Sequence, residues 1–159
     1  MSTSIIPNLK EIEVFLNELN DELNHFNITI DRIKKSKWII PEYRNEKLVA
    51  IAGIDKKLGI VRSWTIVKKE YWKKGIGSNL VYKRKQKCLE DKSCHVLLGI
   101  VERNNIASIK NITKQGYILC GRRGNLRYYF QPITLLGKVM TFIIKITFPI
   151  IRIIDKFRK

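Results

Sequence analysis

Apolar residues near the start of the chain recur at helical spacing. The positions Leu9, Ile12, Phe15, Leu16, Leu19 and Leu23 are three or four residues apart, with acidic residues between them. This period predicts an amphipathic helix from Asn8 to Asn24. Asn8 is a suitable N-cap residue, and Glu11 stands three residues later, where a capping box requires a carboxylate.

Three short runs rich in β-branched and aromatic residues follow this helix. They are KWIIPEYR (37–44), KLVAIAGID (47–55) and GIVRSWTIV (59–67), separated by short polar segments. Runs of this composition and length predict β-strands, and tight turns between them predict an antiparallel meander.

The middle of the chain alternates helical and strand patterns. Residues 78–91 predict a helix with Leu80, Val81, Cys88 and Leu89 on its apolar face, and the apolar run 95–101 predicts a buried central strand. A helix over 106–115 ends at Gly116, and strands at 117–123 and 126–132 form a hairpin around Gly124 and Asn125. We therefore predict an α/β fold with a mixed, mostly antiparallel central sheet and helices on both faces.

The chain changes character after Pro132. Lys138, Lys145 and Arg152 are seven residues apart and form one basic ridge on an otherwise apolar helix. The pattern predicts a domain over residues 1–131 and a basic amphipathic helical tail over 132–159. Three roles stay open for this tail: spanning a membrane, lying on an anionic bilayer surface, or packing against its own domain or a dimer partner. Lys145 near the bilayer centre opposes the first role.

Charge is distributed unevenly along the chain. The net charge of the 159 residues is +17, although residues 1–31 contain six acidic residues and one lysine. Such a field favours an anionic partner: a phosphorylated cofactor, an anionic membrane surface or nucleic acid. Nucleic acid is the least favoured of the three, because the sequence contains no recognisable nucleic-acid-binding motif.

Cysteines and histidines are few. The three cysteines lack C-x-x-C spacing, and the two histidines, His25 and His95, lie far apart. We therefore expect no disulfide framework and no metal site. No signal-peptide pattern opens the chain, so we expect a cytoplasmic protein, peripheral at the inner face of the membrane if the tail binds lipid.

A glycine-containing turn lies where a predicted strand leads into a predicted helix. The segment Lys73-Lys74-Gly75-Ile76-Gly77-Ser78 has two glycines one residue apart beside two lysines. Such a turn can present backbone N–H groups at a helix N-terminus to a phosphate, or it can simply be a basic turn. There is no third glycine for a dinucleotide fingerprint and no Gly-Lys-Ser/Thr for a nucleotide P-loop.

A second segment, thirty residues further on, favours the phosphate-binding interpretation of the turn over a simple basic turn. Asn105 and Ser108 follow an apolar strand, and Gly116-Tyr117 ends the helix after them. Together with the strand end at Val67 and the glycine turn, these residues resemble the GNAT superfamily of acyl-CoA-dependent N-acyltransferases. The resemblance covers residues 48–130.

This resemblance implies an N-acetyltransferase that transfers an acetyl group from acetyl-CoA to an amine acceptor by direct attack in a ternary complex. The amides from Gly75 to Ser78 would hold the pyrophosphate, and the strand end would pair with the pantetheine arm. The implied cofactor-binding residues are Ile66, Val67, Trp72, Lys73, Lys74, Gly75, Ile76, Gly77, Ser78, Asn105 and Ser108.

The chain also departs from the family pattern. Trp72 stands where the family has Gln or Arg, and Ile112 stands where it often has the tyrosine that protonates the departing thiolate. The candidate general base is Glu102, which could instead be a surface residue paired with Arg103 or Lys110. Tyr117 is the candidate acid, with Tyr128, Tyr129 or water as the alternatives.

By this resemblance the acceptor would be bound by variable segments, here the N-terminal helix, the loop that follows it over residues 26–37, and the hairpin around Gly124. Arg122, Arg123 and Arg127 in that hairpin suggest an anionic acceptor. Two alternative functions stay open: a GNAT-like regulator that binds acyl-CoA without turnover, and a non-enzymatic basic module that binds membrane or nucleic acid.

Overall fold

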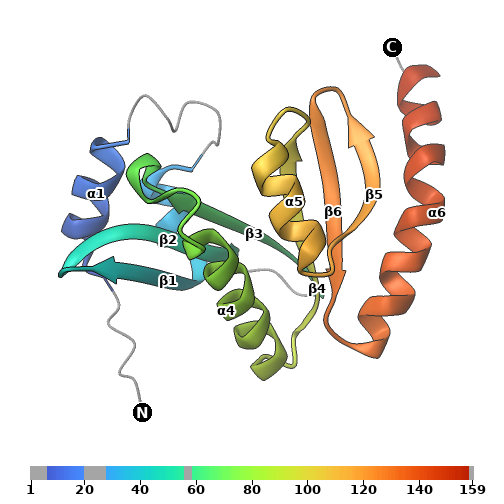
Figure 1. The fold of residues 1–159 in the computed structure, drawn as a ribbon. Helices are drawn as coiled ribbons and strands as arrows, with labels where there is room; N and C mark the ends of the chain where they lie inside the picture. Colours follow the sequence, from blue (N-terminus) through green and yellow to red (C-terminus); the bar gives the residue numbers. More distant parts are fainter. Residues whose placement is uncertain (1–6, 20–27, 56–58, 158–159) are drawn as a thin grey trace. The chain divides into compact units, whose positions relative to one another are not determined.

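The computed structural model describes residues 7–19, 28–55 and 59–157, with side chains up to residue 148 (Figure 1). The elements in chain order are α1 (Leu9–Asn17), α3 (Ile30–Lys34), β1 (Ser36–Arg44), β2 (Lys47–Asp55), β3 (Gly59–Val67), the 3-10 turn η1 (Lys69–Tyr71), α4 (Ile76–Glu90), β4 (Cys94–Glu102), α5 (Ile106–Lys114), β5 (Ile118–Arg123), β6 (Leu126–Pro132) and α6 (Leu135–Phe157).

The strands form a six-stranded sheet in the order β1-β2-β3-β4-β6-β5. The pairs β1–β2, β4–β6 and β5–β6 are antiparallel, and β3–β4 is parallel because α4 connects these two strands. The predicted mixed, mostly antiparallel sheet is confirmed, and so is the central position of β4.

Two compact units divide the chain. The first comprises residues 1–56 and 64–84, and the second comprises residues 57–63 and 85–159. The strand β3 and the helix α4 each contribute residues to both units. The two units are described separately below.

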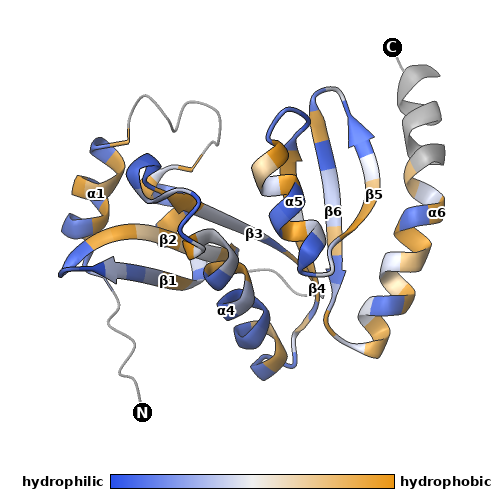
Figure 2. Ribbon diagram, in the orientation of Figure 1, coloured by the Kyte–Doolittle hydropathy of each residue, from blue (hydrophilic) through white to orange (hydrophobic). Residues whose placement is uncertain are grey.

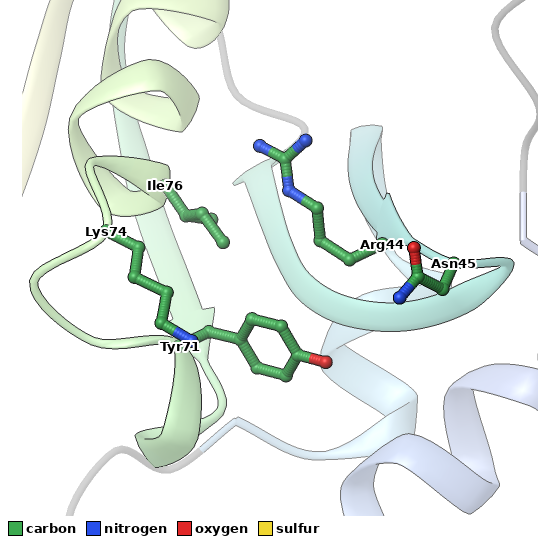
Figure 3. Close-up of a pocket in the computed structure, with 5 residues that line it drawn as sticks. All are labelled: Arg44, Asn45, Tyr71, Lys74 and Ile76. Atoms are coloured by element: carbon green, nitrogen blue, oxygen red, sulfur yellow. The ribbon is translucent and has the colours of Figure 1, made fainter.

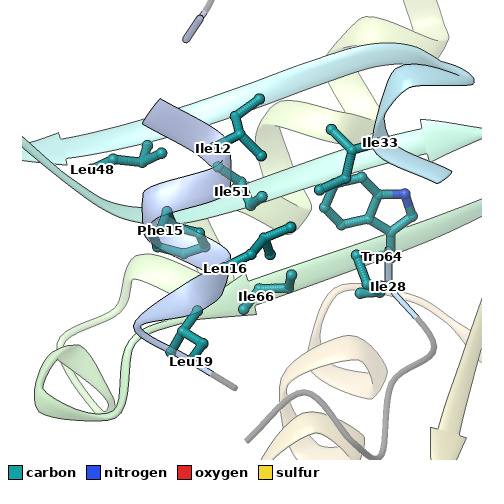
Figure 4. Close-up of a cluster of buried hydrophobic side chains, with 10 residues drawn as sticks. All are labelled: Ile12, Phe15, Leu16, Leu19, Ile28, Ile33, Leu48, Ile51, Trp64 and Ile66. Atoms are coloured by element: carbon teal, nitrogen blue, oxygen red, sulfur yellow. The ribbon is translucent and has the colours of Figure 1, made fainter. Parts of the chain in front are cut away.

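In the first unit, α1 and α3 cover one side of the strands (Figure 4). Their buried side chains pack with residues of β2 and β3 in a cluster of Ile12, Phe15, Leu16, Leu19, Ile28, Ile33, Leu48, Ile51, Trp64 and Ile66. Gly53 leaves room for the indole of Trp64, since a Cβ atom there would lie 2.0 Å from the ring. The start of α4 packs in a separate cluster, in which Ile76 and Leu80 meet Val49, Ala50 and Ala52.

The predicted start of the first helix is confirmed. The Asn8 side chain accepts a hydrogen bond from the Glu11 amide at 2.7 Å. The Glu11 carboxylate in turn accepts a 3.0 Å hydrogen bond from the Tyr43 hydroxyl. Burial and this bond raise the pKa of Tyr43 to about 12, so the phenol stays a donor. The helix ends at Asn17, and residues 20–24 of the predicted span lie outside the described residues.

Two predictions about helices were wrong. Residues 26–37 were expected to form a loop, but α3 begins after Thr29, whose hydroxyl accepts from the Arg32 amide. Five residues are too few to show a helical period in sequence. The apolar face of α4 was assigned wrongly at one position: Leu80, Val81 and Cys88 are buried as predicted, but Leu89 is 51% exposed. Arg84, which was not assigned to this face, is only 3% exposed. Arg84 is four residues from both Leu80 and Cys88, which places it on their side of the helix.

In the second unit, α5 and α6 lie on opposite faces of the strands (Figure 1). On the α5 side, a Cβ atom at Gly99 of β4 would lie 3.5 Å from the Tyr117 ring and 3.9 Å from Ile112. On the α6 side, Met140 and Ile144 pack against a cluster formed by Val96, Cys120 and Phe130. The strand β4 therefore has both faces covered, as its continuous apolar sequence predicts.

The start of α6 is held against β4. The carbonyl of His95 accepts hydrogen bonds from the amides of Ile133 (2.8 Å) and Thr134 (3.4 Å). The Thr134 hydroxyl caps the helix by accepting from the Gly137 amide at 3.1 Å. The tail therefore packs on its own sheet, one of the three roles that its sequence left open. Among the described residues, no helix combines the length and the apolar character needed to span a membrane.

Candidate functional site

The glycine turn of the first unit has the backbone that its sequence predicts. Lys73 and Gly75 both adopt positive φ, 62° and 78°, and α4 begins at the next residue. The Asn79 amide donates to the Gly75 carbonyl at 3.0 Å, which makes Gly75 the N-cap residue. Lys73 takes a conformation that glycine adopts more easily.

The N-terminus of α4 differs from those of the other α-helices in the described part of the chain. Asn8, Thr29, Asn105 and Thr134 each cap a helix with a side-chain oxygen. At the start of α4 the cap residue is glycine, and the first turn contains no acidic residue. Neither the glycine at the cap position nor an acidic residue of the first turn therefore offsets the partial positive charge of this helix end. An external anion can take that place.

Trp72 holds the turn in a way that its sequence position did not suggest. Its indole N–H donates a 2.8 Å hydrogen bond to the carbonyl of Val67, the last residue of β3, while the side chain is 54% exposed. The Trp72 side chain therefore ties the turn to the strand end from the position where the family has Gln or Arg.

We predict that Trp72→Phe loosens this turn. Phenylalanine keeps the aromatic surface but lacks the donor, and one such hydrogen bond contributes about 1 kcal/mol. Amide exchange at Gly75 to Gly77, followed by NMR, should become about fivefold faster. Exchange in α5 is the internal reference, and equal acceleration there would contradict a local role for Trp72.

A cavity of about 270 Å³ lies next to the turn, lined by Arg44, Asn45, Tyr71, Lys74 and Ile76 (Figure 3). Arg44 and Asn45 come from the end of the β1–β2 hairpin, and the other three come from the turn and the start of α4. The Lys74 ammonium lies 4.9 Å from the centre of the Tyr71 ring. Two cationic side chains thus line the cavity beside the N-terminus of α4, which suits an anionic group.

A buried carboxylate close to this cavity in sequence is already paired. Glu42, which is 8% exposed, accepts from Arg44 at 3.2 Å and from Lys83 at 2.8 Å. The two cations therefore offset the single charge of Glu42.

The end of β3 precedes the turn. The described β3–β4 ladder covers Gly59–Arg62, so Ser63 to Val67 lie outside it. Ile66 is buried with the α1 cluster, and Val67 packs with the α4 cluster.

The second unit contains the other predicted cofactor residues. The Asn105 side chain caps α5 by accepting from the Ser108 amide at 3.0 Å. The side-chain oxygen of Asn105 therefore has a structural role. Both residues lie at the start of α5, the helix that follows β4. The predicted spacing of three residues is that of an N-cap and its partner amide.

The candidate catalytic residues also lie in the second unit, on or beside β4. Glu102 ends the strand, is partly exposed, and forms no ion pair with Arg103, Lys110 or any other described residue. The alternative of a paired surface glutamate is therefore not seen. Tyr117 is 3% exposed and packs against Gly99. Ile112, at the family's tyrosine position, is buried.

The arginines of the β5–β6 hairpin face one another. Arg122 and Arg127 are direct partners across the two strands, and Arg122 is exposed. Two like charges placed directly opposite are unfavourable unless an anion lies near them.

A comparison with protein-family models identifies the family to which the chain belongs. The model of the acetyltransferase (GNAT) family matches residues 8–117. The chain belongs to the GNAT acetyltransferase family. Its cofactor is accordingly acetyl-CoA.

Solved structures agree on the fold. A GNAT family acetyltransferase from Streptococcus pneumoniae is 18% identical, with a TM-score of 0.66 over 79% of this chain and 94% of that one. The putative acetyltransferase yncA from Salmonella typhimurium, solved with its cofactor acetyl-CoA, is 14% identical, with a TM-score of 0.66 over 81% and 92%. The ribosomal-protein-S18-alanine N-acetyltransferase from Escherichia coli is 16% identical, with a TM-score of 0.65 over 84% and 93%. No curated protein matches the sequence.

Lys74 and Ile76 of this GNAT protein were predicted as cofactor-binding residues, whereas the other residues that line the cavity were not foreseen from sequence. Arg44 and Asn45 precede the glycine turn by about thirty residues, in a hairpin that carries no family motif. The one local signal is the Asn45-Glu46 pair, which forms the hairpin turn with both φ angles positive, 48° and 61°.

Proposed function

We propose that the chain is an N-acetyltransferase in which the first unit binds the phosphates of acetyl-CoA through the turn from Lys73 to Ser78. The observation that supports this most directly is the start of α4, which has a glycine cap, no acidic residue in its first turn and lysines immediately before it. Backbone amides at such a helix end bind phosphate oxygens. Lys74 and Arg44 add positive charge next to them.

Acetyl-CoA, when bound, supplies the acetyl group as a reactive thioester. The chain's own residues bind the cofactor, orient it toward the acceptor, and transfer protons. We propose that a backbone N–H near the end of β3 donates to the thioester carbonyl and stabilises the negative charge that develops on it. Ser63 to Val67, which lie outside the β3–β4 ladder, are the residues that can supply this donor.

In the second unit, we propose Glu102 as the base that accepts a proton from the acceptor amine, which then attacks directly in a ternary complex. Its partial exposure and its lack of an ion pair among the described residues support this role. Tyr117 is the proposed acid. Because Tyr117 is buried, its hydroxyl would donate a proton only to a group that enters the protein interior.

We propose an amine acceptor that also carries an anionic group, on a small molecule, a sugar nucleotide or a protein near the inner face of the membrane. The facing pair Arg122 and Arg127 supports the anionic group. The free cysteines Cys88, Cys94 and Cys120 support a cytoplasmic location.

The first experiment is calorimetric titration of the full chain with acetyl-CoA, followed by thioester consumption with a panel of amines. Glu102→Gln should lower turnover at least about a hundredfold and leave the acetyl-CoA Kd unchanged, because a general base contributes at this scale. Glu90→Gln, an exposed carboxylate at the end of α4, is the matched control.

Each outcome of this experiment has a defined meaning. Absence of binding at millimolar acetyl-CoA contradicts the proposal. Binding without thioester consumption across the panel favours a regulator that binds acyl-CoA without turnover. Equal turnover in Glu102→Gln and Glu90→Gln would exclude Glu102 as the base.

A further inference from the structure

The outward side of α6 carries a row of large apolar side chains. Leu135, Leu136, Val139, Phe142, Ile143 and Ile146 are 52–77% exposed, and we call them the outer face of α6. Leu135, Val139, Phe142 and Ile146 are spaced four, three and four residues apart, which places them in one stripe along the helix. In Figure 2 the described length of α6 is mostly apolar, interrupted by polar positions.

The described part of the chain leaves this outer face exposed. The opposite side of α6 packs on the second unit through Gly137, Met140, Ile144 and Phe148. Gly121 of β5 gives Phe148 its place, since a Cβ atom there would lie 2.2 Å from the ring. The helix is therefore held rigidly by one side while it exposes the other, and an exposed apolar stripe of this size indicates a binding surface.

Basic residues border the stripe. Lys138 and Lys145 are exposed, are seven residues apart, and so lie in one row beside the outer face. The sequence from 135 to 148 contains no acidic residue, and the continuation to 159 adds four basic residues and only Asp155. Apolar side chains next to a row of cations are complementary to a bilayer with anionic headgroups.

We propose that the outer face of α6 docks this protein onto an anionic lipid bilayer. The apolar stripe enters the interface between headgroups and acyl chains, and Lys138 and Lys145 bind the headgroup layer. A second copy of the chain is a poorer occupant, because its residues 135–148 contain no acidic side chain that could pair with Lys138 and Lys145. The inference is independent of acetyl transfer.

Co-flotation of the full chain with vesicles tests this surface. We expect the protein to float with vesicles of phosphatidylcholine and phosphatidylserine, to float less at high salt, and to stay unbound with phosphatidylcholine alone. Point variants are needed rather than truncation after residue 131, because truncation would expose the packed side of the sheet.

Phe142→Glu places a charge in the middle of the stripe and should weaken partitioning at least about tenfold. Leu89→Glu, the same change at an exposed apolar position of α4, is the matched control and should float like the parent. The double variant Lys138→Glu/Lys145→Glu should lose its preference for phosphatidylserine. The control is the double variant Lys110→Glu/Lys114→Glu on α5, which should retain most of that preference.

Three results would overturn the proposal. One is failure of the parent protein to float with phosphatidylserine vesicles, and another is equal flotation of Phe142→Glu and the parent. The third is a dimer in sedimentation velocity that Phe142→Glu dissociates, which would assign the outer face to a second copy. Acetyl-CoA binding, measured on the same samples, reports on the proposed activity separately.

Discussion

Replacing Gly77 by glutamate is expected to abolish coenzyme A binding while leaving the protein as stable as before or more stable. Gly77 is the second residue of α4, within the proposed phosphate cradle. A carboxylate there lies beside the first amides of the helix, which is where an anionic ligand would bind, and it repels that ligand as well. We expect the Kd for coenzyme A to rise at least about a hundredfold.

The effect of Gly77→Glu on stability separates lost binding from lost folding. Glutamate has a higher helix propensity than glycine by about 0.5–1 kcal/mol, and an acid in the first turn stabilises the helix further. The melting temperature should therefore not fall. Gly77→Gln has nearly the same size without the charge and should bind more tightly than the glutamate variant. Tyr82→Glu adds the same charge at an exposed position further along α4.

Calorimetric titration with coenzyme A would decide the matter. An affinity for Gly77→Glu within about threefold of the parent would mean that the phosphates bind elsewhere. The prediction requires both results in the same variant: weaker coenzyme A binding and an unchanged or higher melting temperature. A variant that loses both binding and thermal stability would show only that it is misfolded.

Gly137→Ala is expected to destabilise the protein, although the same change in an exposed helix usually stabilises it. A Cβ atom at Gly137 would lie 1.9 Å from the backbone oxygen of His95 and 3.3 Å from Val96. That oxygen already accepts hydrogen bonds from Ile133 and Thr134, so it cannot easily move. The added methyl group must push α6 off β4, and overpacking of this kind costs about 1–3 kcal/mol.

Urea denaturation of the full chain measures this effect. The exposed neighbour Lys138 provides the control, since Lys138→Ala should change the unfolding free energy by less than about 0.5 kcal/mol. If α6 were a free tail, Gly137→Ala would instead raise its helix propensity by about 1 kcal/mol. A Gly137→Ala protein at least as stable as its parent would therefore show that α6 does not pack on the sheet.

Much of this protein is determined locally by its sequence. The strands β1, β2 and β3 follow their runs of β-branched residues almost to the residue, and Asn8 caps α1 as the neighbouring Glu11 indicates. Gly75, in the turn before α4, has the positive φ angle that a glycine permits. These features depend on residues within one turn or one strand of each other, where propensity and period act directly.

Other features were decided by contacts between distant segments. The burial of Arg84, the cavity between Arg44 and Lys74, and the hydrogen bond from Trp72 to Val67 each depend on where a second segment lies. The apolar sequence of α6 was compatible with a membrane span, an interfacial helix or a packed helix. Only the approach of Gly137 to His95 and of Phe148 to Gly121 determined which side packs on the sheet and which six side chains stay exposed. The periodicity of apolar residues in the sequence shows only that a side of the helix is apolar. Close packing of α6 against the sheet determines which apolar side is buried.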